Sequence, residues 1–243
     1  MMQHVRRIGF GLFTTLAIFG LMGQAPAAAQ ERFEVTSIKA VRPHLVNTVA
    51  ALQQRDVAKA KAAFEAYDSG WNGIEMYINT RSRPLYQALE IELQAKVNKA
   101  LEGPNPDVAA MLADVQAMLV KYDEAINLIE KATPLNPLYD DVARIRIVRA
   151  HLREVPPALK AGNFAKARKS FEAFDKNWDS IEDLIKAKSA DAYVAIEKGM
   201  IDIEQALMPN PPDAAKVTAL VNAVMAQYNA QLAEIMKDAR ARQ

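Results

Sequence analysis

Apolar residues recur along most of this chain at the spacing of an amphipathic α-helix. Between residues 64 and 78 they fall three, four or seven positions apart, and the same period runs through residues 108–129. Such spacing places apolar side chains on one face of a helix, whereas a half-buried strand would alternate apolar and polar residues. No segment keeps that alternation for the length of a strand, so the sequence predicts an all-α fold.

Proline, glycine and capping residues divide this pattern into helices. Helix ends are indicated by Pro84, by the turn at residues 103–106 followed by Asp107, by residues 134–137 and by Gly162. Because the connections are short, consecutive helices should run antiparallel. The predicted helices span residues 37–53, 55–79, 84–102, 106–132, 139–160, 163–187, 189–207 and 212–241.

The chain also repeats itself at an offset of 107 residues. Residues 56–75 align with residues 163–182, and ten of the twenty aligned residues are identical. Past a one-residue deletion the offset becomes 106, so that Tyr122 corresponds to Tyr228. The match predicts a tandem duplication of an antiparallel four-helix unit, eight helices in total, with unit 1 at residues 30–137 and unit 2 at residues 138–243. A single eight-helix array, or an exchange of helices between units, fits the pattern almost as well.

Residues 1–29 have the features of a secretory signal peptide. Arg6 and Arg7 precede an uncharged apolar run, and the small residues that follow predict cleavage after Ala29. The apolar run is shorter than the ~20 residues that a membrane-spanning helix needs. We therefore expect a periplasmic or secreted protein that is not embedded in a membrane after cleavage.

Composition excludes several classes of function. Loss of residues 1–29 removes two arginines and no acidic residue, so the formal charge changes from +1 to −1, which gives no electrostatic basis for nucleic-acid binding. The absence of cysteine excludes disulfides and thiolate metal ligands. We find no phosphate-binding loop, no nucleophile elbow and no Ser, His and Asp set, and therefore expect no enzyme activity.

Polar side chains that recur in both units are the candidates for a functional site, because a solvated helix face drifts freely after duplication. Two of them, Glu75 and Glu90, lie on or beside apolar helix faces, where an unpaired carboxylate would be strongly unfavourable. The candidate metal ligands are His44, Glu75 and Glu90 in unit 1 and His151, Glu182 and Glu197 in unit 2, with Arg42, Asp68, Tyr86, Arg149, Asp175 and Tyr193 as supporting residues.

Two interpretations of these residues are open. In the first, each histidine converges with the two glutamates of its unit and binds a metal ion, since helical bundles build such sites and oxygen and nitrogen ligands suit iron, manganese or zinc. In the second, the set is structural: Arg42 pairs with Glu75 or Glu90, and the tyrosine and histidine are satisfied inside the bundle. No H-x-x-E or E-x-x-H pair occurs on one helix, so the ferritin-like di-iron pattern is absent. Trp71 and Trp178 are expected in the core.

Residues 58–90 and 165–197 share the pattern A-K-A-(K/R)-x-x-F-E-A-(Y/F)-D-x-x-W-x-x-I-E, followed by Y-x-A-(L/I)-E. This pattern resembles the helical periplasmic region of some bacterial members of the FTR1 iron permease family. The resemblance implies a free-standing periplasmic component that binds iron or docks on a membrane iron transporter. The chain lacks the R-E-x-x-E motif of such permeases and the G-x-H-x-x-E motif of imelysin-type iron-uptake proteins.

From the sequence we therefore expect a periplasmic, non-enzymatic metal-binding protein that assists iron uptake or transport. The alternative, from a different class, is a helical scaffold or adaptor that presents its duplicated bundles to a protein partner, with the repeated polar residues acting as internal struts. A bundle that binds a small molecule through its tryptophans is a third, weaker possibility.

Overall fold

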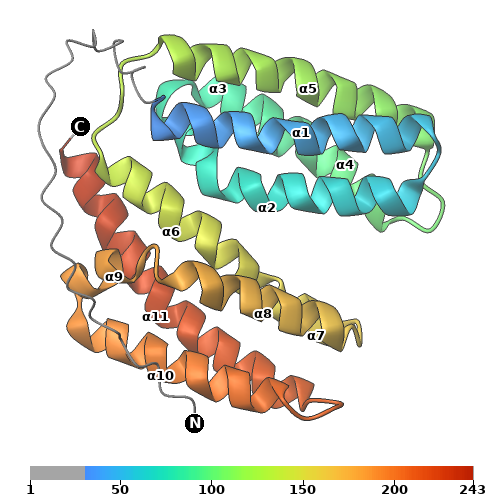
Figure 1. The fold of residues 1–243 in the computed structure, drawn as a ribbon. Coiled ribbons are helices and arrows are strands. Elements are labelled where there is room, and N and C mark those ends of the chain that lie inside the picture. Colours follow the sequence, from blue (N-terminus) through green and yellow to red (C-terminus); the bar gives the residue numbers. More distant parts are fainter. Residues whose placement is uncertain (1–30, 243) are drawn as a thin grey trace, which may run out of the picture. The chain divides into compact units, whose positions relative to one another are not determined.

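Helices account for nearly all of residues 31–242, the part of the chain that the computed structural model describes (Figure 1). No strand occurs in this part, so the predicted all-α fold is confirmed. None of its helices is both long enough and apolar enough to cross a membrane. The predicted signal peptide at residues 1–29 lies outside the described residues.

The first half of the described chain contains four helical segments. The first, second and last of them are α1 (Phe33–Gln53), α2 (Val57–Arg81) and α5 (Val108–Lys131). The third is continuous but changes type, from α3 (Arg83–Tyr86) through the π-helix η1 (Gln87–Gln94) to α4 (Ala95–Glu102). Helix α1 contacts both α2 and α5, and α5 contacts η1 and α4, so the four segments form a bundle.

The second half is built in the same order, with two interruptions. Its elements are α6 (Leu138–Arg153), α7 (Val155–Lys160), α8 (Phe164–Trp178), α9 (Glu182–Lys188), α10 (Ala190–Leu207) and α11 (Ala214–Ala241).

The prediction of continuous helices at residues 139–160 and 163–187 is therefore wrong, because each region forms two helices. The first is broken before Pro156 and Pro157, which have no backbone N–H with which to continue the hydrogen bonds of α6. The second is broken at Asp179 and Ser180, two exposed residues of low helix propensity.

The π-helix lies where the sequence repeat changes its offset. Glu90 matches a residue 107 positions later, whereas Asp107 matches one 106 positions later, so the first half carries one additional residue between them. A π-helix accommodates such a residue because its hydrogen bonds span five residues instead of four. Beyond it Val97 is buried, as is Ile203 of α10, 106 positions later. The additional residue is absorbed inside the helix.

Several contacts have the same form in both halves. The hydroxyl of Tyr122 donates to the carbonyl of Ile38 at 2.8 Å, and Tyr228 donates to Ile145 at the same distance. These bonds join the last helix of each half to the first. Helix N-caps correspond as well, in the pairs Asp56 and Asn163, Ser82 and Ser189, and Asp107 and Asp213.

The two halves meet where α2 packs against α6. A Cβ atom added at Gly73 would lie 2.5 Å from Cγ1 of Ile147, so the absence of a side chain allows this close approach. Met76 is buried one turn further along α2. In the second half Ser180 and Asp183 stand at the corresponding positions and are exposed. That face is polar, as is usual for the terminal face of a repeat array.

We expect Gly73→Ala to lower the free energy of unfolding by about 1–3 kcal/mol, because the added methyl group overpacks the contact with Ile147. Chemical denaturation measures this change. Gly103→Ala is the matched control, since its Cβ would meet nothing nearer than the Ala100 carbonyl oxygen at 3.4 Å. Adding Ile147→Ala to the first variant should recover part of the loss. Equal stabilities of the two alanine variants would contradict close packing at Gly73.

Candidate functional site

Each half contains a buried tryptophan whose indole N–H donates to a glutamate 19 residues later in the chain. Trp71 on α2 donates to Oε2 of Glu90 on η1. Trp178 at the end of α8 donates to Oε1 of Glu197 on α10. The predicted core position of both tryptophans is confirmed. A carboxylate near the core is unfavourable unless it accepts a hydrogen bond, and the indole N–H supplies that bond. The two bonds join α2 to η1 in the first half and α8 to α10 in the second.

A tyrosine stacks on each of these tryptophans. The rings of Trp71 and Tyr86 have centroids 6.4 Å apart and an interplanar angle of 13°, and Trp178 and Tyr193 have the same values. The tyrosine of the last helix also contacts the indole in each half. Each tryptophan thus connects three helical segments, and each candidate tyrosine lies beside its candidate glutamate.

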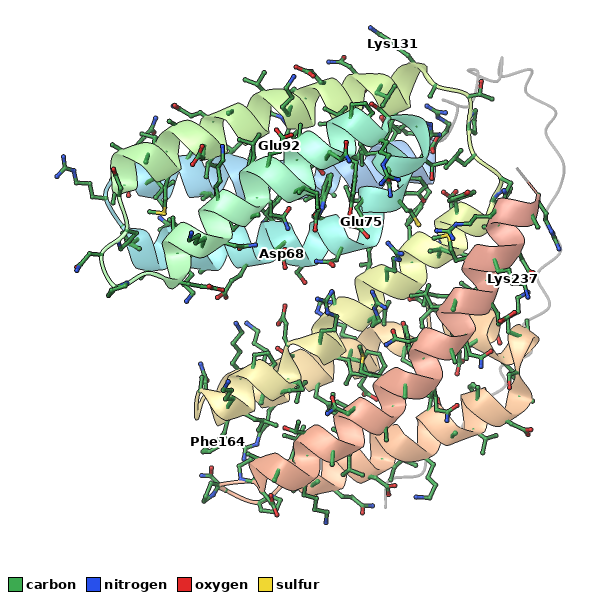
Figure 2. The ribbon with its side chains drawn as sticks, turned by 180° about the vertical axis from the view of Figure 1, so that it is seen from behind. Asp68, Glu75, Glu92, Lys131, Phe164 and Lys237 are labelled. Atoms are coloured by element: carbon green, nitrogen blue, oxygen red, sulfur yellow. The ribbon has the colours of Figure 1, made fainter. Side chains whose placement is uncertain are left out.

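Glu75 connects the two halves. Its Oε1 accepts a hydrogen bond from Nη1 of Arg146 on α6 at 2.9 Å, and both side chains are only about one-fifth exposed, at 23% and 20%. Burial raises the pKa of the Glu75 carboxyl, and the charge of Arg146 partly opposes that shift. Figure 2 shows Glu75 and Asp68 on α2.

The predicted pairing of Arg42 with Glu75 or Glu90 is wrong. Nε and Nη2 of Arg42 instead donate to the two carboxylate oxygens of Asp123 on α5, at 2.6 and 2.9 Å. The comparison of the two sequence repeats did not identify Arg146, because the corresponding residue in the first half is Lys39. A search restricted to recurring residues could not find a contact that exists only between the halves.

The structure brings part of the candidate ligand set together. Burial is the main cause of the raised pKa of Glu90, and the neighbouring charges of Glu75 and Asp68 raise it further. These three carboxyl groups therefore lie on one side of the first half. His44 on α1 does not join them: within residues 31–242 no group of three or more histidine, aspartate and glutamate side chains is arranged to hold a metal ion.

The second-half candidates are more dispersed. His151 lies on α6 and is partly exposed, and Glu182 is the first residue of α9. Burial, followed by the charges of Glu197 and Glu182, raises the pKa of Tyr193, so both glutamates lie near its phenol. Asp175 is exposed on α8.

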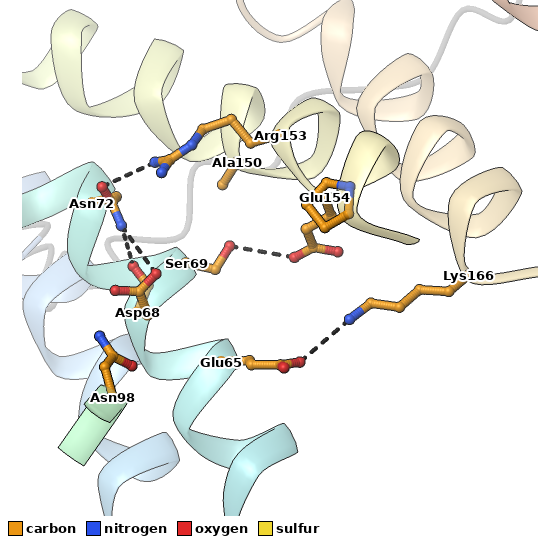
Figure 3. A pocket seen from close by; sticks show the side chains of 10 residues that line it. Glu65, Asp68, Ser69, Asn72, Asn98, Ala150, Arg153, Glu154 and Lys166 are labelled. Carbon is orange, nitrogen blue, oxygen red and sulfur yellow. Dashed lines mark hydrogen bonds and ion pairs between the residues drawn. The ribbon is translucent and has the colours of Figure 1, made fainter. Parts of the chain in front are cut away.

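A cavity of about 260 Å³ separates α2 from the segment α6–α8 (Figure 3). Hydrogen bonds and ion pairs cross it or border it: Ser69 donates to Glu154 at 3.5 Å, and Lys166 pairs with Glu65 at 3.3 Å. Its lining consists of Glu65, Asp68, Ser69, Asn72, Asn98, Ala150, Arg153, Glu154, Pro157 and Lys166. Most of the polar side chains that line the cavity bind one another. They therefore form a polar contact region, the seam, between the two halves.

Asp68 is held at the wall of this cavity. Its Oδ1 accepts from Nε2 of Gln94 at 2.6 Å, and the amide of Asn72 donates to its backbone carbonyl at 2.7 Å. Arg153 in turn donates to Oδ1 of Asn72 at 3.0 Å. Asp68 therefore belongs to a chain of contacts that runs from η1 through α2 to α6.

Comparisons with models of protein families, with curated proteins and with solved structures give no match. The resemblance to the periplasmic region of iron permeases thus rests on its motif residues alone. Two of those residues in each half, the tryptophan and the final glutamate of the pattern, are the partners in the indole–carboxylate bond.

Glu90→Gln should change how stability depends on pH. Burial raises the pKa of Glu90 above its ordinary value of 4.5, so its contribution to stability is complete below that value and is lost as pH rises through the folded-state pKa. The amide oxygen of glutamine can still accept from Trp71. We therefore expect the variant to gain stability relative to the wild type as pH increases, measured by denaturation between pH 4 and pH 8.

Glu92→Gln, on the exposed side of the same π-helix, controls for the loss of one negative charge. A stability difference between Glu90→Gln and the wild type that stays constant across this pH range would contradict a raised pKa of the half-buried Glu90 carboxyl.

Proposed function

We propose that this protein is a non-enzymatic helical adaptor whose α10 binds an amphipathic helix of a partner protein. One observation carries the proposal: Val194, Ile201 and Met208 are 62%, 54% and 68% exposed, and each is seven residues from the next. Met208 caps α10 in a helical conformation. Seven residues make about two helical turns, so the three side chains lie in a row along one side of α10, with the exposed residues Lys198 and Gln205 between them. We call this row the apolar stripe.

The stripe is peculiar to the second half. Single exposed apolar residues are ordinary on protein surfaces, but a row of them along one helix indicates an interaction site. The corresponding positions in the first half hold Gln87, Ala95 and Glu102, all exposed. The apolar row is therefore a specific feature of α10 and no general consequence of the repeated pattern.

The surroundings of the stripe favour a basic partner. A cavity of about 390 Å³ adjoins its C-terminal end, lined by Arg168, Phe171, Glu172, Asp175, Glu204, Leu207 and Met208. Arg168 donates to the backbone carbonyls of Leu207 and Pro209, which leaves three exposed carboxylates around an apolar floor. A helix with one large apolar side chain for this cavity and basic residues on its flanks would match both features.

Three of the recurring glutamates, Glu75, Glu90 and Glu197, have hydrogen-bond partners within the protein, which favours the adaptor over metal binding. Trp71 binds Glu90, Trp178 binds Glu197, and Glu75 binds Arg146. We propose further that the chain is a tandem duplication of a four-helix unit. The matching tyrosine hydrogen bonds, helix caps and tryptophan stacks of the two halves support this view.

Metal binding is the second candidate, and the proximity of Glu75, Glu90 and Asp68 favours it. A hard cation such as iron would be drawn to these carboxylates. It would have to displace Arg146 from Glu75 and the indole from Glu90, which makes the adaptor the better supported function. Export to the periplasm and association with an iron transporter belong to the same proposal.

A synthetic helical peptide tests the adaptor. It should contain roughly 20 residues to hold a stable helix, with leucine at heptad positions and lysine on the flanks. We expect it to bind and to shift NMR signals of α10. We expect Ile201→Asp to weaken that binding about tenfold or more by placing a charge in the stripe.

Two controls accompany this experiment. Ile91→Asp alters an isoleucine of similar exposure in the first half, 61% against 54% for Ile201, and should leave peptide binding unchanged. A peptide with glutamate in place of lysine should bind much more weakly. Absence of binding by the basic peptide, or signal shifts confined to other helices, would contradict the proposal.

A further inference from the structure

The contact between the two halves leaves a corresponding surface exposed at each end of the repeat. Within the chain, the outer face of α2 packs against α6 and reaches the start of α8. The residues of the first half that correspond to this part of α6 and α8 are exposed, and we call them the α1 surface: Lys39, Ala40, Val46 and Lys59. The residues of the second half that correspond to the outer face of α2 are exposed apart from the partly buried Glu182, and we call them the α8 surface: Glu172, Asp179, Ser180 and Glu182.

The closest packing of the contact has a counterpart of matching size on these two surfaces. Gly73 lies against Ile147 in the chain, where an added Cβ atom would clash. The counterpart of Gly73 is the larger Ser180, and the counterpart of Ile147 is the smaller Ala40. Because the increase on one side is accompanied by a decrease on the other, the two surfaces suit a close approach of their helices.

An ion pair of the contact is preserved in both residue types. Lys166 pairs with Glu65 at 3.3 Å across the seam. The corresponding residues, Lys59 on the α1 surface and Glu172 on the α8 surface, are again a lysine and a glutamate. Both are exposed, and within residues 31–242 neither side chain forms an ion pair. Each is therefore available to an opposite charge on another molecule.

A second ion pair is preserved in sign. Glu75 accepts from Arg146, and the corresponding residues are Glu182 and Lys39. Lys39 already pairs with two glutamates of its own half, but all three side chains are exposed. Exposed pairs of this kind contribute little to stability, so Lys39 can change partner at little cost.

The remaining contact does not recur but introduces no repulsion. Arg153 donates to Asn72 at 3.0 Å, and the corresponding residues are Val46 and Asp179. The counterpart surfaces therefore place opposite charges, and no like charges, at the positions of the internal contact. Since the α8 surface is polar, ion pairs would hold such a contact more than apolar burial does, and salt should weaken it.

We propose that the α8 surface of one copy of this protein binds the α1 surface of a second copy, as the first half binds the second within one chain. Units of a repeat array contact their neighbours through the same pair of surfaces. Because the two surfaces differ, the contact does not close on itself, and copies join head to tail. The contact does not involve the apolar stripe of α10; only Glu172 also lines the cavity at the end of that stripe.

Sedimentation velocity over a range of protein concentrations tests this association. We expect the sedimentation coefficient to rise with concentration at low salt and to return to the monomer value at about 0.5 M salt, where charges are screened within about 4 Å. Glu172→Lys and Lys59→Glu should each weaken association about tenfold or more, because each places like charges opposite one another.

Exchanging the charges supplies the control. Lys59→Glu combined with Glu172→Lys in one chain should restore association, as should an equimolar mixture of the two single variants. Lys96→Glu, at an exposed lysine of α4, should leave association unchanged. The proposal is overturned if the protein is monomeric at every concentration in low salt, or if the exchanged variant associates no better than the single variants. Association that Ile201→Asp abolishes and both single variants leave intact would assign the contact to the apolar stripe and would equally overturn it.

Discussion

The close packing of α2 against α6 is the constraint on which the arrangement of the polar residues depends. Gly73 lets the two helices approach until Ile147 fills the space of the missing side chain. At that separation Arg146 reaches Glu75, and Arg153 reaches Asn72. An ion pair that is mostly withdrawn from water is costly to break once formed, because either partner alone would be left as an uncompensated charge. The seam between the halves therefore determines which carboxylates remain available for a ligand.

The helical pattern of the fold could be predicted from the sequence with few errors. Apolar spacing identified the helices, and Asp107 was correctly expected to cap α5, since its side chain accepts from two backbone N–H groups of the first turn. The breaks at Pro156 and Asp179, and the π-helix, were missed. Periodicity reports which face of a helix is buried, and it is insensitive to a single changed hydrogen bond or one additional residue.

The candidate site was harder to predict, because recurrence selects residues with the same role in both halves. That criterion found Glu90 and Tyr86, which do lie together beside the core residue Trp71. It could not find Arg146, whose contact with Glu75 crosses between halves and has no counterpart. It also paired Arg42 wrongly, because the true partner, Asp123, is replaced by asparagine in the second half. The spacing of residues along one helix does not predict which side chains of distant elements will contact each other.

Differences between the halves are consequently more informative about function than their similarities. The recurring Glu90 and Glu197 join helices within their own halves through the indole N–H of Trp71 and Trp178. By contrast, the apolar stripe on α10 occurs only in the second half, and the first half has polar or small residues at the same positions. Arg149 binds the neutral Asn229 where Arg42 of the first half binds the carboxylate of Asp123.

If the recurring glutamates have the structural role of holding helices together, they should not act as metal ligands. The most direct measurement is a calorimetric titration of metal-stripped protein with iron, manganese, zinc and copper ions, for the wild type and for Glu75→Gln combined with Glu182→Gln. We expect no saturable binding that depends on these two glutamates. Tight binding of one of these ions by the wild type, lost in the double variant while helicity is retained, would contradict a structural role for the glutamates.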